Sequence, residues 1–233
     1  SVVTNFQHQP SPLSLGMLMK SCLAVLVGSA AGACPPEDFS SITDFDLDGY
    51  ISKRWYIQQV METSYLPKSH NWCVYAEYQR LPKKSPNGYE VGVHNYAEEA
   101  DGTIHDSNID IKGGIMAKIV DEKTGKLTVA PNFLPTFLAG PYWVIAYDEA
   151  EGYSLVSGGA PKKDGEAGLC KTGSGVNDAG LWIFTRAQKT DEKLVAKVRE
   201  IAKNKGFDLS VLRQVDHSNC TQSTSMHSSD VIV

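Results

Sequence analysis

Short segments in which apolar and polar positions alternate follow one another from Asp44 to Arg186. Each segment is rich in aromatic or β-branched residues and is bounded by Gly, Pro, Asn or Asp, a pattern typical of strands in an antiparallel sheet. We predict eight strands, at Arg54–Thr63, Trp72–Leu81, Tyr89–Tyr96, Thr103–Ile111, Lys126–Asn132, Tyr142–Tyr147, Tyr153–Ser157 and Leu181–Arg186.

Turn-forming residues separate these segments. They are Pro86-Asn87-Gly88, Asp101-Gly102, Thr124-Gly125 and Glu151-Gly152. Such sequences favour tight hairpins or short loops. Consecutive strands are therefore expected to pair with each other.

One helix is predicted after the last strand. Thr190 can cap it, Asp191 and Glu192 lie in its first turn, and Gly206 ends it. The apolar residues that repeat at helical spacing are Leu194, Val195, Val198, Ile201 and Ala202. Since the opposite face is charged, we expect this helix to pack on the outside of the sheet.

Eight up-and-down strands with one packed helix predict an all-β fold, a closed antiparallel barrel with a C-terminal helix outside. Closure removes exposed strand edges, and a barrel of this size can hold one small ligand.

A separate apolar stretch, Leu13–Ala33, precedes the barrel. It ends in small residues that resemble an export cleavage site after Ala33, and it is interpreted as signal-like. Lys20, Gly16 and Gly28 weaken it as a membrane-spanning helix, and a helix that contacts a membrane or a complex is the alternative. The expected organisation is residues 1–33 as this segment, 34–220 as the barrel with its helix, and 221–233 as a C-terminal tail.

Composition is that of one folded domain. Apolar residues make up 42% of the 233 residues and charged residues 21%, which excludes wholesale disorder. The net charge is −5 and no basic block is present, so nucleic acid is not an expected partner.

The five cysteines, Cys22, Cys34, Cys73, Cys170 and Cys220, contain no CxxC pair and no histidine at metal-ligand spacing. No metal and no cofactor are therefore predicted. Their wide separation suggests long-range disulfides, hence an oxidising compartment, and the odd count leaves one thiol over.

Four stretches, in order along residues 34–220, resemble the lipocalin family, most closely the branch with apolipoprotein D, bacterial lipocalins and chloroplast lipocalins. They are Phe45–Tyr56, Pro141–Asp148 followed by Tyr153–Ser157, Leu181–Arg186, and the helix that leads through Gly206-Phe207-Asp208 to Cys220. Lys53 stands where the family has Gly, and Tyr147 replaces a Thr, although the following Asp148 is kept.

The resemblance implies structural roles for six residues. Trp55 would close one end of the barrel, with the Arg186 guanidinium over its indole in a cation–π contact. It also implies the disulfides Cys34–Cys170 and Cys73–Cys220, which leaves Cys22 unpaired. The Gly-rich insert from Ser157 to Gly180 is longer than usual and is expected to reshape or cover one barrel end.

The resemblance also places Tyr78 and Trp182 inside the barrel, and strand alternation then assigns further inward positions. The predicted ligand-binding residues are Val74, Ala76, Tyr78, Val93, Asn95, Tyr142, Val144, Val156, Trp182 and Phe184. An apolar cavity with a few polar groups suits one elongated or ringed hydrophobic molecule. The alternative is a solid barrel filled by these side chains.

No catalytic constellation is found in the sequence, although His94 and His105 fall on neighbouring predicted strands. The predicted function is therefore to bind or carry a small hydrophobic molecule such as a lipid or carotenoid. A lipocalin-type isomerase or de-epoxidase and a non-binding structural subunit are the alternatives.

The predicted location is an oxidising compartment, either the thylakoid lumen or the cell exterior. A further prediction is that residues 1–33 attach the barrel to a larger membrane complex, in a photosynthetic setting suggested by the likeness to chloroplast lipocalins.

Overall fold

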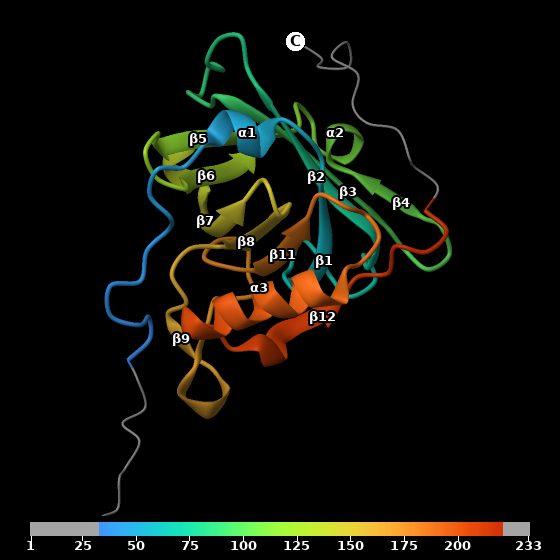
Figure 1. Cartoon of the computed structure of the whole chain (residues 1–233). Helices are drawn as coiled ribbons and strands as arrows, with labels where there is room; N and C mark the ends of the chain where they lie inside the picture. Colours follow the sequence, from blue (N-terminus) through green and yellow to red (C-terminus); the bar gives the residue numbers. More distant parts are fainter. Residues whose placement is uncertain (1–32, 221–233) are drawn as a thin grey trace, which may run out of the picture. The chain divides into compact units, whose positions relative to one another are not determined.

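Eight antiparallel strands close into a barrel in the computed structural model, which describes residues 33–220 (Figure 1). The barrel strands are β1 (Trp55–Met61), β2 (Trp72–Arg80), β3 (Val91–Glu98), β5 (Ile115–Asp121), β6 (Lys126–Pro131), β7 (Gly140–Asp148), β8 (Tyr153–Ser157) and β11 (Leu181–Thr185). Each pairs with the next, and β11 pairs back onto β1 from Tyr56↔Thr185 to Val60↔Trp182. The expected up-and-down barrel is confirmed.

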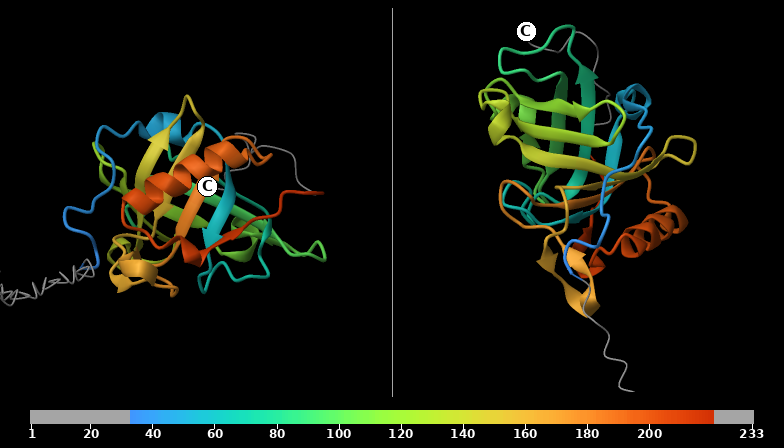
Figure 2. Two further views of the ribbon diagram at one scale, coloured as in Figure 1. Left: turned by 60° about the horizontal axis from the view of Figure 1, so that its bottom comes forward. Right: turned by 90° about the vertical axis from the view of Figure 1, so that its left-hand side faces the viewer.

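The remaining helices and strands lie around these eight strands (Figure 2). They are α1 (Leu47–Ile51), β4 (Ile104–Asp106), α2 (Ser107–Asp110), η1 (Thr136–Leu138), β9 (Lys163–Asp164), η2 (Glu166–Gly168), β10 (Cys170–Lys171), α3 (Glu192–Asn204), η3 (Leu209–Val211) and β12 (Leu212–Gln214). β4 pairs with the end of β3, β12 pairs with β1, and β9 with β10 forms a separate two-stranded sheet. Within residues 33–220, no helix is long and apolar enough to cross a membrane.

The strand predicted at Thr103–Ile111 is wrong in most of its length. Only β4 is extended there, because the Asp106 carboxylate accepts a hydrogen bond from Asn108 N at 2.9 Å and begins α2. Asp and Asn side chains compete in this way with strand pairing.

The fourth barrel strand is β5, which the sequence pattern did not predict. Apolar residues occupy both of its faces, and Val120 is 56% exposed, so alternation is hidden. Gly113 and Gly114, with φ of +79° and +69°, turn the chain into this strand.

Helix α3 lies outside the barrel against β8 and β11, as expected. Its N-cap is Asp191 and not Thr190: the Asp191 carboxylate accepts from Lys193 N and Leu194 N, whereas Thr190 Oγ1 donates to Gln58. Gly206 follows the helix with a φ of +86°, the left-handed conformation that favours glycine at a helix end.

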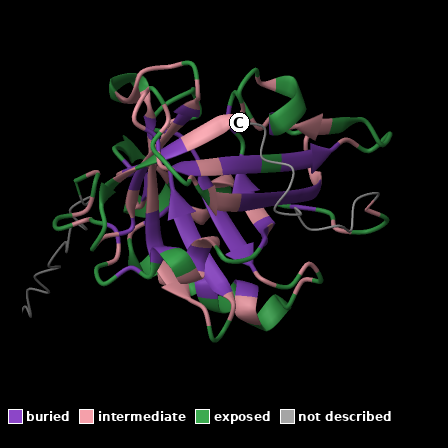
Figure 3. Ribbon diagram, turned by 90° about the horizontal axis from the view of Figure 1, so that it is seen from above, coloured by how far each residue is buried: buried purple, intermediate pink, exposed green. Residues whose placement is uncertain are grey.

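Strand β11 packs against two apolar cores, one inside the barrel and one outside it. Trp182 and Phe184 belong to the interior core, while Leu181 and Ile183 belong to the core beneath α3. All five residues of this strand are buried for this reason. Figure 3 shows buried residues concentrated along the barrel strands and exposed residues in the loops.

A stacked cation and indole close one end of the barrel. Trp55 is fully buried, and the Arg186 guanidinium carbon lies 3.5 Å from the centre of its ring. Arg186 Nη2 donates to the carbonyls of Gly49 and Tyr50, both at 2.9 Å, and to Glu149 at 2.8 Å. Trp55 Nε1 donates to the Tyr50 carbonyl at 2.8 Å, so α1 is bound to both side chains.

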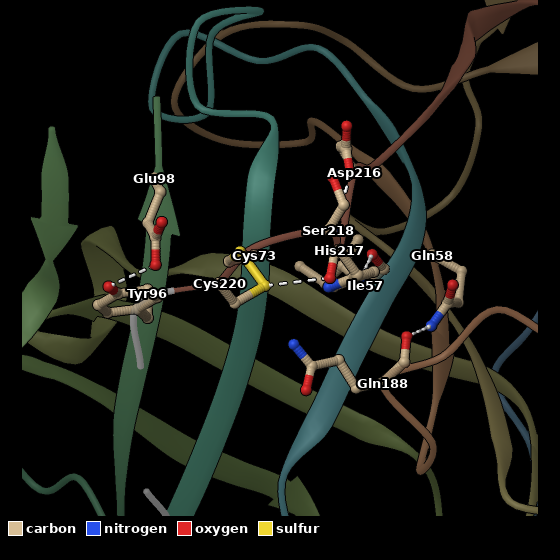
Figure 4. Close-up of a disulfide and its surroundings, with 10 residues drawn as sticks. All are labelled: Ile57, Gln58, Cys73, Tyr96, Glu98, Gln188, Asp216, His217, Ser218 and Cys220. Carbon is tan, nitrogen blue, oxygen red and sulfur yellow. Dashed lines mark hydrogen bonds between the residues drawn. A yellow bond between two sulfur atoms is a disulfide. The ribbon is translucent and has the colours of Figure 1, made fainter. Parts of the chain in front are cut away.

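Two disulfides attach the two ends of the described part to the fold, one at the small β9–β10 sheet and one at the barrel strand β2. Cys34 is joined to Cys170 in β10, and Cys73 in β2 to Cys220. Beside the second disulfide, His217 Nε2 donates to the Ile57 carbonyl at 2.9 Å (Figure 4). Cys22, expected to be unpaired, lies outside the described residues.

A buried ionic chain connects the outer face of β2 and β3 to β4. Arg54 Nε donates to Glu77 at 2.9 Å, and His94 lies 3.2 Å from Glu77 through Nδ1 and 3.0 Å from Asp106 through Nε2. Burial alone lowers the pKa of His94, but its hydrogen bond to Glu77 and the charge of Asp106 outweigh burial, so the pKa is raised above the usual 6.5. When His94 is protonated, it therefore attaches β4 to the outer face of β2 and β3 through both carboxylates.

Replacing His94 with Gln should lower the free energy of unfolding most at about pH 5.5, because the protonated imidazole gains two carboxylate partners only in the folded state. A raised pKa stabilises the fold fully below the unfolded-state value and loses that effect as the pH rises through the folded-state value. The loss is expected to be on the order of 2 kcal/mol at low pH and to shrink toward about pH 8.5. Urea unfolding of both proteins across this range measures it.

The buried His217 is present in both proteins and does not disturb this comparison. Burial lowers its pKa, which gives both proteins the opposite pH trend, and this trend cancels in the difference. A difference that grows with pH would show that neutral His94 is the stabilised form.

Replacing Trp55 with Ala should lower the free energy of unfolding by about 3 to 5 kcal/mol, the usual cost of truncating a large core side chain. The half-buried Trp143, which packs against Phe39 on the α3 side of the barrel, provides the matched control and should cost less. Chemical denaturation measures both. A loss below about 1 kcal/mol for Trp55→Ala would contradict its role in closing the barrel.

Candidate functional site

The barrel encloses a cavity of about 610 Å³. Eight of the ten predicted ligand-binding residues line it: Val74, Ala76, Tyr78, Val93, Asn95, Tyr142, Trp182 and Phe184. Val144 and Val156 are fully buried in the interior core but do not line the cavity. The barrel is therefore hollow and not solid.

Three tyrosines form a hydrogen-bonded chain at the inner end of the cavity. The Tyr142 hydroxyl lies 2.7 Å from that of Tyr78 and 2.7 Å from that of Tyr50. Tyr50 also contacts the Trp55 ring, which places this chain between the cavity and the closed end.

The hydroxyls of this chain stay neutral at ordinary pH. Burial raises the pKa of Tyr50 to about 12, and burial raises the pKa values of Tyr78 and Tyr142 well above their usual range. Two hydrogen bonds use two of the three O–H donors. One donor therefore remains for Ser154, which lies beside Tyr50, or for a bound molecule.

Aromatic side chains form one wall of the cavity, next to the tyrosine chain that forms its floor. The Trp182 indole stacks on Tyr142 with 6.5 Å between ring centres and 25° between planes. Gly180 lies directly beneath the indole, where a Cβ would lie 2.1 Å from the ring, and its φ is +104°. A glycine at this position is thus required for Trp182 to lie flat against the cavity.

Asn95 supplies a second polar group. It belongs to β3, yet it is exposed, whereas its neighbours His94 and Tyr96 are buried. Because Asn95 lines the cavity, its exposure comes from the cavity itself.

The Gly-rich insert crosses the mouth of the cavity. Ser174 O accepts from Ser64 N at 2.8 Å, Ala179 O accepts from the Tyr65 hydroxyl at 3.0 Å, and Asn177 Nδ2 donates to Leu138 O at 3.3 Å. These contacts connect the loop between β1 and β2 to the loop between β6 and β7. The insert was expected to reshape or cover one end, and it narrows this one.

Apolar side chains are exposed around the mouth. Phe137 is 83% exposed and Val176 77% exposed, and Tyr65 and Leu138 are about half exposed. Tyr65, Leu138 and Val176 also line the cavity, so the apolar surface continues from the rim inward.

Histidines gather at the rim in a way the sequence reading missed. His105 stacks on His70, and both line the cavity, whereas His94 faces outward toward Asp106. His94 and His105 therefore lie on opposite faces of the sheet. The turn at Asp101-Gly102 contained a usable signal, because a tight hairpin there brings Glu99 and His105 to one face. The contribution of His70 from a distant loop had no local signal.

Comparison with known proteins identifies the fold through structure alone. No protein-family profile matches the sequence, and no curated protein matches it. Among solved structures, apocrustacyanin C1 aligns with a TM-score of 0.52 at 16% identity over 76% of this chain and 82% of that one.

Two further structures are similar. Lobster apocrustacyanin A1 aligns with a TM-score of 0.51 at 15% identity over 75% of this chain and 81% of its own. Insecticyanin from the tobacco hornworm Manduca sexta aligns with a TM-score of 0.51 at 18% identity over 81% and 88%. At these identities the likeness establishes the fold, and residues 33–220 have the lipocalin fold.

Proposed function

We propose that this protein binds and carries one small hydrophobic molecule inside its barrel. The observation that carries the proposal is the cavity of about 610 Å³, which is open at one end, closed at the other and lined mainly by apolar and aromatic side chains. Sites for small apolar ligands share this combination of volume, apolar lining and a few convergent polar groups.

The floor of the cavity favours an uncharged end of the ligand. Neither Lys nor Arg is found among the described residues that line the cavity, and the Arg186 charge is already paired with Glu149. A carboxylate buried at the floor would lack a counter-charge and would be strongly disfavoured. A hydroxyl or carbonyl can instead bind to Asn95 or to the tyrosine chain, while any charged group stays at the mouth.

The aromatic wall favours a flat or conjugated ligand. Trp182 and Tyr142 present stacked rings, and aromatic groups pack best in offset or edge-to-face contact with such surfaces. Elongated and ringed apolar molecules can both pack against such a surface. Examples are fatty acids, sterols, bilins, retinoids and carotenoids.

The two disulfides indicate an oxidising compartment, since such bonds are reduced in the cytosol. Within that class we propose the thylakoid lumen or the cell exterior. The pairing of Cys34 with Cys170 and of Cys73 with Cys220 supports placing the chain near the apolipoprotein D branch, for which the resemblance implied the same pairs.

Attachment to a photosynthetic membrane complex stays a prediction from the sequence. It rests on residues 1–33, which lie outside the described residues except for Ala33. Deleting residues 1–33 and fractionating membranes tests it: a shortened barrel that still sediments with the membranes would exclude this segment as the anchor.

Replacing Trp182 or Tyr78 with Ala should weaken binding of a hydrophobic ligand on the order of tenfold, equivalent to ~1.4 kcal/mol, because each removes an aromatic surface from the cavity. Titration with a fluorescent fatty acid and with a carotenoid measures the affinity. The matched control is Trp143→Ala, which removes an indole from the outer side of the barrel and should leave affinity unchanged.

Binding as strong as in the unmodified protein, in both folded cavity variants, would show that the ligand lies elsewhere. Native mass spectrometry of the purified protein gives the mass of any molecule that copurifies. Conversion of that molecule into a product on incubation would instead support the enzyme alternative.

A further inference from the structure

Three metal-ligating side chains meet at the mouth of the cavity. His70 lies in the loop between β1 and β2, Glu99 directly follows β3, and His105 lies in β4, which pairs with the end of β3 (Figure 1). His105 Nε2 lies 2.8 Å from Glu99 Oε1, and His70 Nε2 lies 3.5 Å from the same oxygen. One ligand atom from each residue lies within 4.8 Å of the other two.

These separations are close to those of a tetrahedral metal site. Zinc binds histidine nitrogen and carboxylate oxygen at about 2.0 to 2.2 Å, which places neighbouring ligand atoms ~3.4 Å apart. The observed 3.5 Å and 2.8 Å lie on either side of that spacing. Because the two imidazole rings are stacked nearly parallel, the His70 ring must also turn when an ion binds, so that both imidazole lone pairs point at it.

The backbone fixes two of the three ligands on one face. His105 is opposite Ala97 in the β3–β4 ladder, and Glu99 N donates to Thr103 O at 2.9 Å across the turn. Glu99 and His105 are therefore diagonal neighbours on the side of the hairpin that faces the cavity. The His70 ring is held against that of His105, with ring centres 3.5 Å apart and 22° between planes.

The local charge suits a cation. The charges of Glu99 and Asp110 act on His70 in favour of a cation, and Arg213 opposes them. Arg213 hydrogen-bonds to Asn71 and to the Pro67 carbonyl. Beside His70, the two negative charges of Glu99 and Asp110 therefore outnumber the one positive charge of Arg213.

We propose that His70, Glu99 and His105 form a zinc-binding site at the mouth of the cavity. Two imidazoles and one carboxylate favour zinc over magnesium, which prefers oxygen ligands only. Three protein ligands leave a fourth position for water or for a metal-binding group on a molecule in the cavity. The site stands independently of the proposed carrier function, because it is formed by protein side chains alone.

Calorimetric titration of the full chain with zinc chloride, without any hydrophobic ligand, tests the proposal. One zinc ion should bind to this site, and His105→Gln or Glu99→Gln should weaken that binding by more than about tenfold, since loss of outer-shell partners alone typically costs 10-fold to 100-fold. Glu122→Gln is the matched control, because it removes the same charge from the exposed turn between β5 and β6. Magnesium chloride should give no comparable binding.

Cobalt provides a readout that a structural role would not change. Cobalt(II) in a tetrahedral nitrogen and oxygen site absorbs visible light, and this absorption should disappear in His105→Gln while the circular dichroism of the fold is kept. Zinc affinity in His105→Gln equal to that of the unmodified protein would overturn the proposal, and so would the lack of one-to-one zinc binding in the unmodified protein.

Discussion

The contact between Arg186 and Trp55 is the interaction on which the rest of the molecule depends. A closed eight-stranded barrel has two ends, and in this one rigid side chains fill one end while the interior beside them stays hollow. The indole fills that end, and the guanidinium covers it at 3.5 Å while it binds the carbonyls of Gly49 and Tyr50. Burial raises the pKa of Glu149, but the hydrogen bond and charge of Arg186 outweigh burial and hold the pKa below its usual value. The pair is therefore ionised, and the Glu149 carboxylate balances the charge of the Arg186 guanidinium.

The shape of the cavity follows from this arrangement. Large aromatic groups lie next to the closed end, where Tyr50 contacts Trp55 and hydrogen-bonds to Tyr142, which in turn hydrogen-bonds to Tyr78. Smaller side chains such as Val74, Ala76 and Val93 also line the cavity. The result is a floor that can make a hydrogen bond without carrying a charge, next to largely apolar walls. For the proposed carrier function, this arrangement favours a molecule with an apolar body and one polar end.

The two charged clusters lie on the outer face of the barrel and at the rim of the cavity. The chain from Arg54 through Glu77 and His94 to Asp106 lies on the outer face of β2 and β3, and the His70–Glu99–His105 cluster lies at the mouth. The same short hairpin carries both, because β4 directs Asp106 outward and His105 inward. His94 on one face of this hairpin thus lies close to the mouth of the cavity on the other face. The insert and the loop between β6 and β7 complete the rim with apolar side chains.

The sequence by itself determined the barrel, its inward-facing residues and the helix outside. Side-chain alternation, turn residues and helical periodicity are local properties, so α3 was placed outside from a short stretch of chain. The resemblance to lipocalins placed Trp182 inward, and alternation then placed Phe184 on the same face. Strand β5 was not predicted, because apolar residues on both of its faces hide the alternation. The early end of β4 was not predicted either, because it depends on a hydrogen bond from Asn108 N to the Asp106 side chain and not on strand propensity. Only the tertiary structure decided the tyrosine chain, the path of the insert across the mouth and the meeting of His70 with Glu99 and His105. These contacts join helices, strands and loops that lie far apart in the chain. Their geometry depends on barrel closure, for which no short stretch of sequence holds the information.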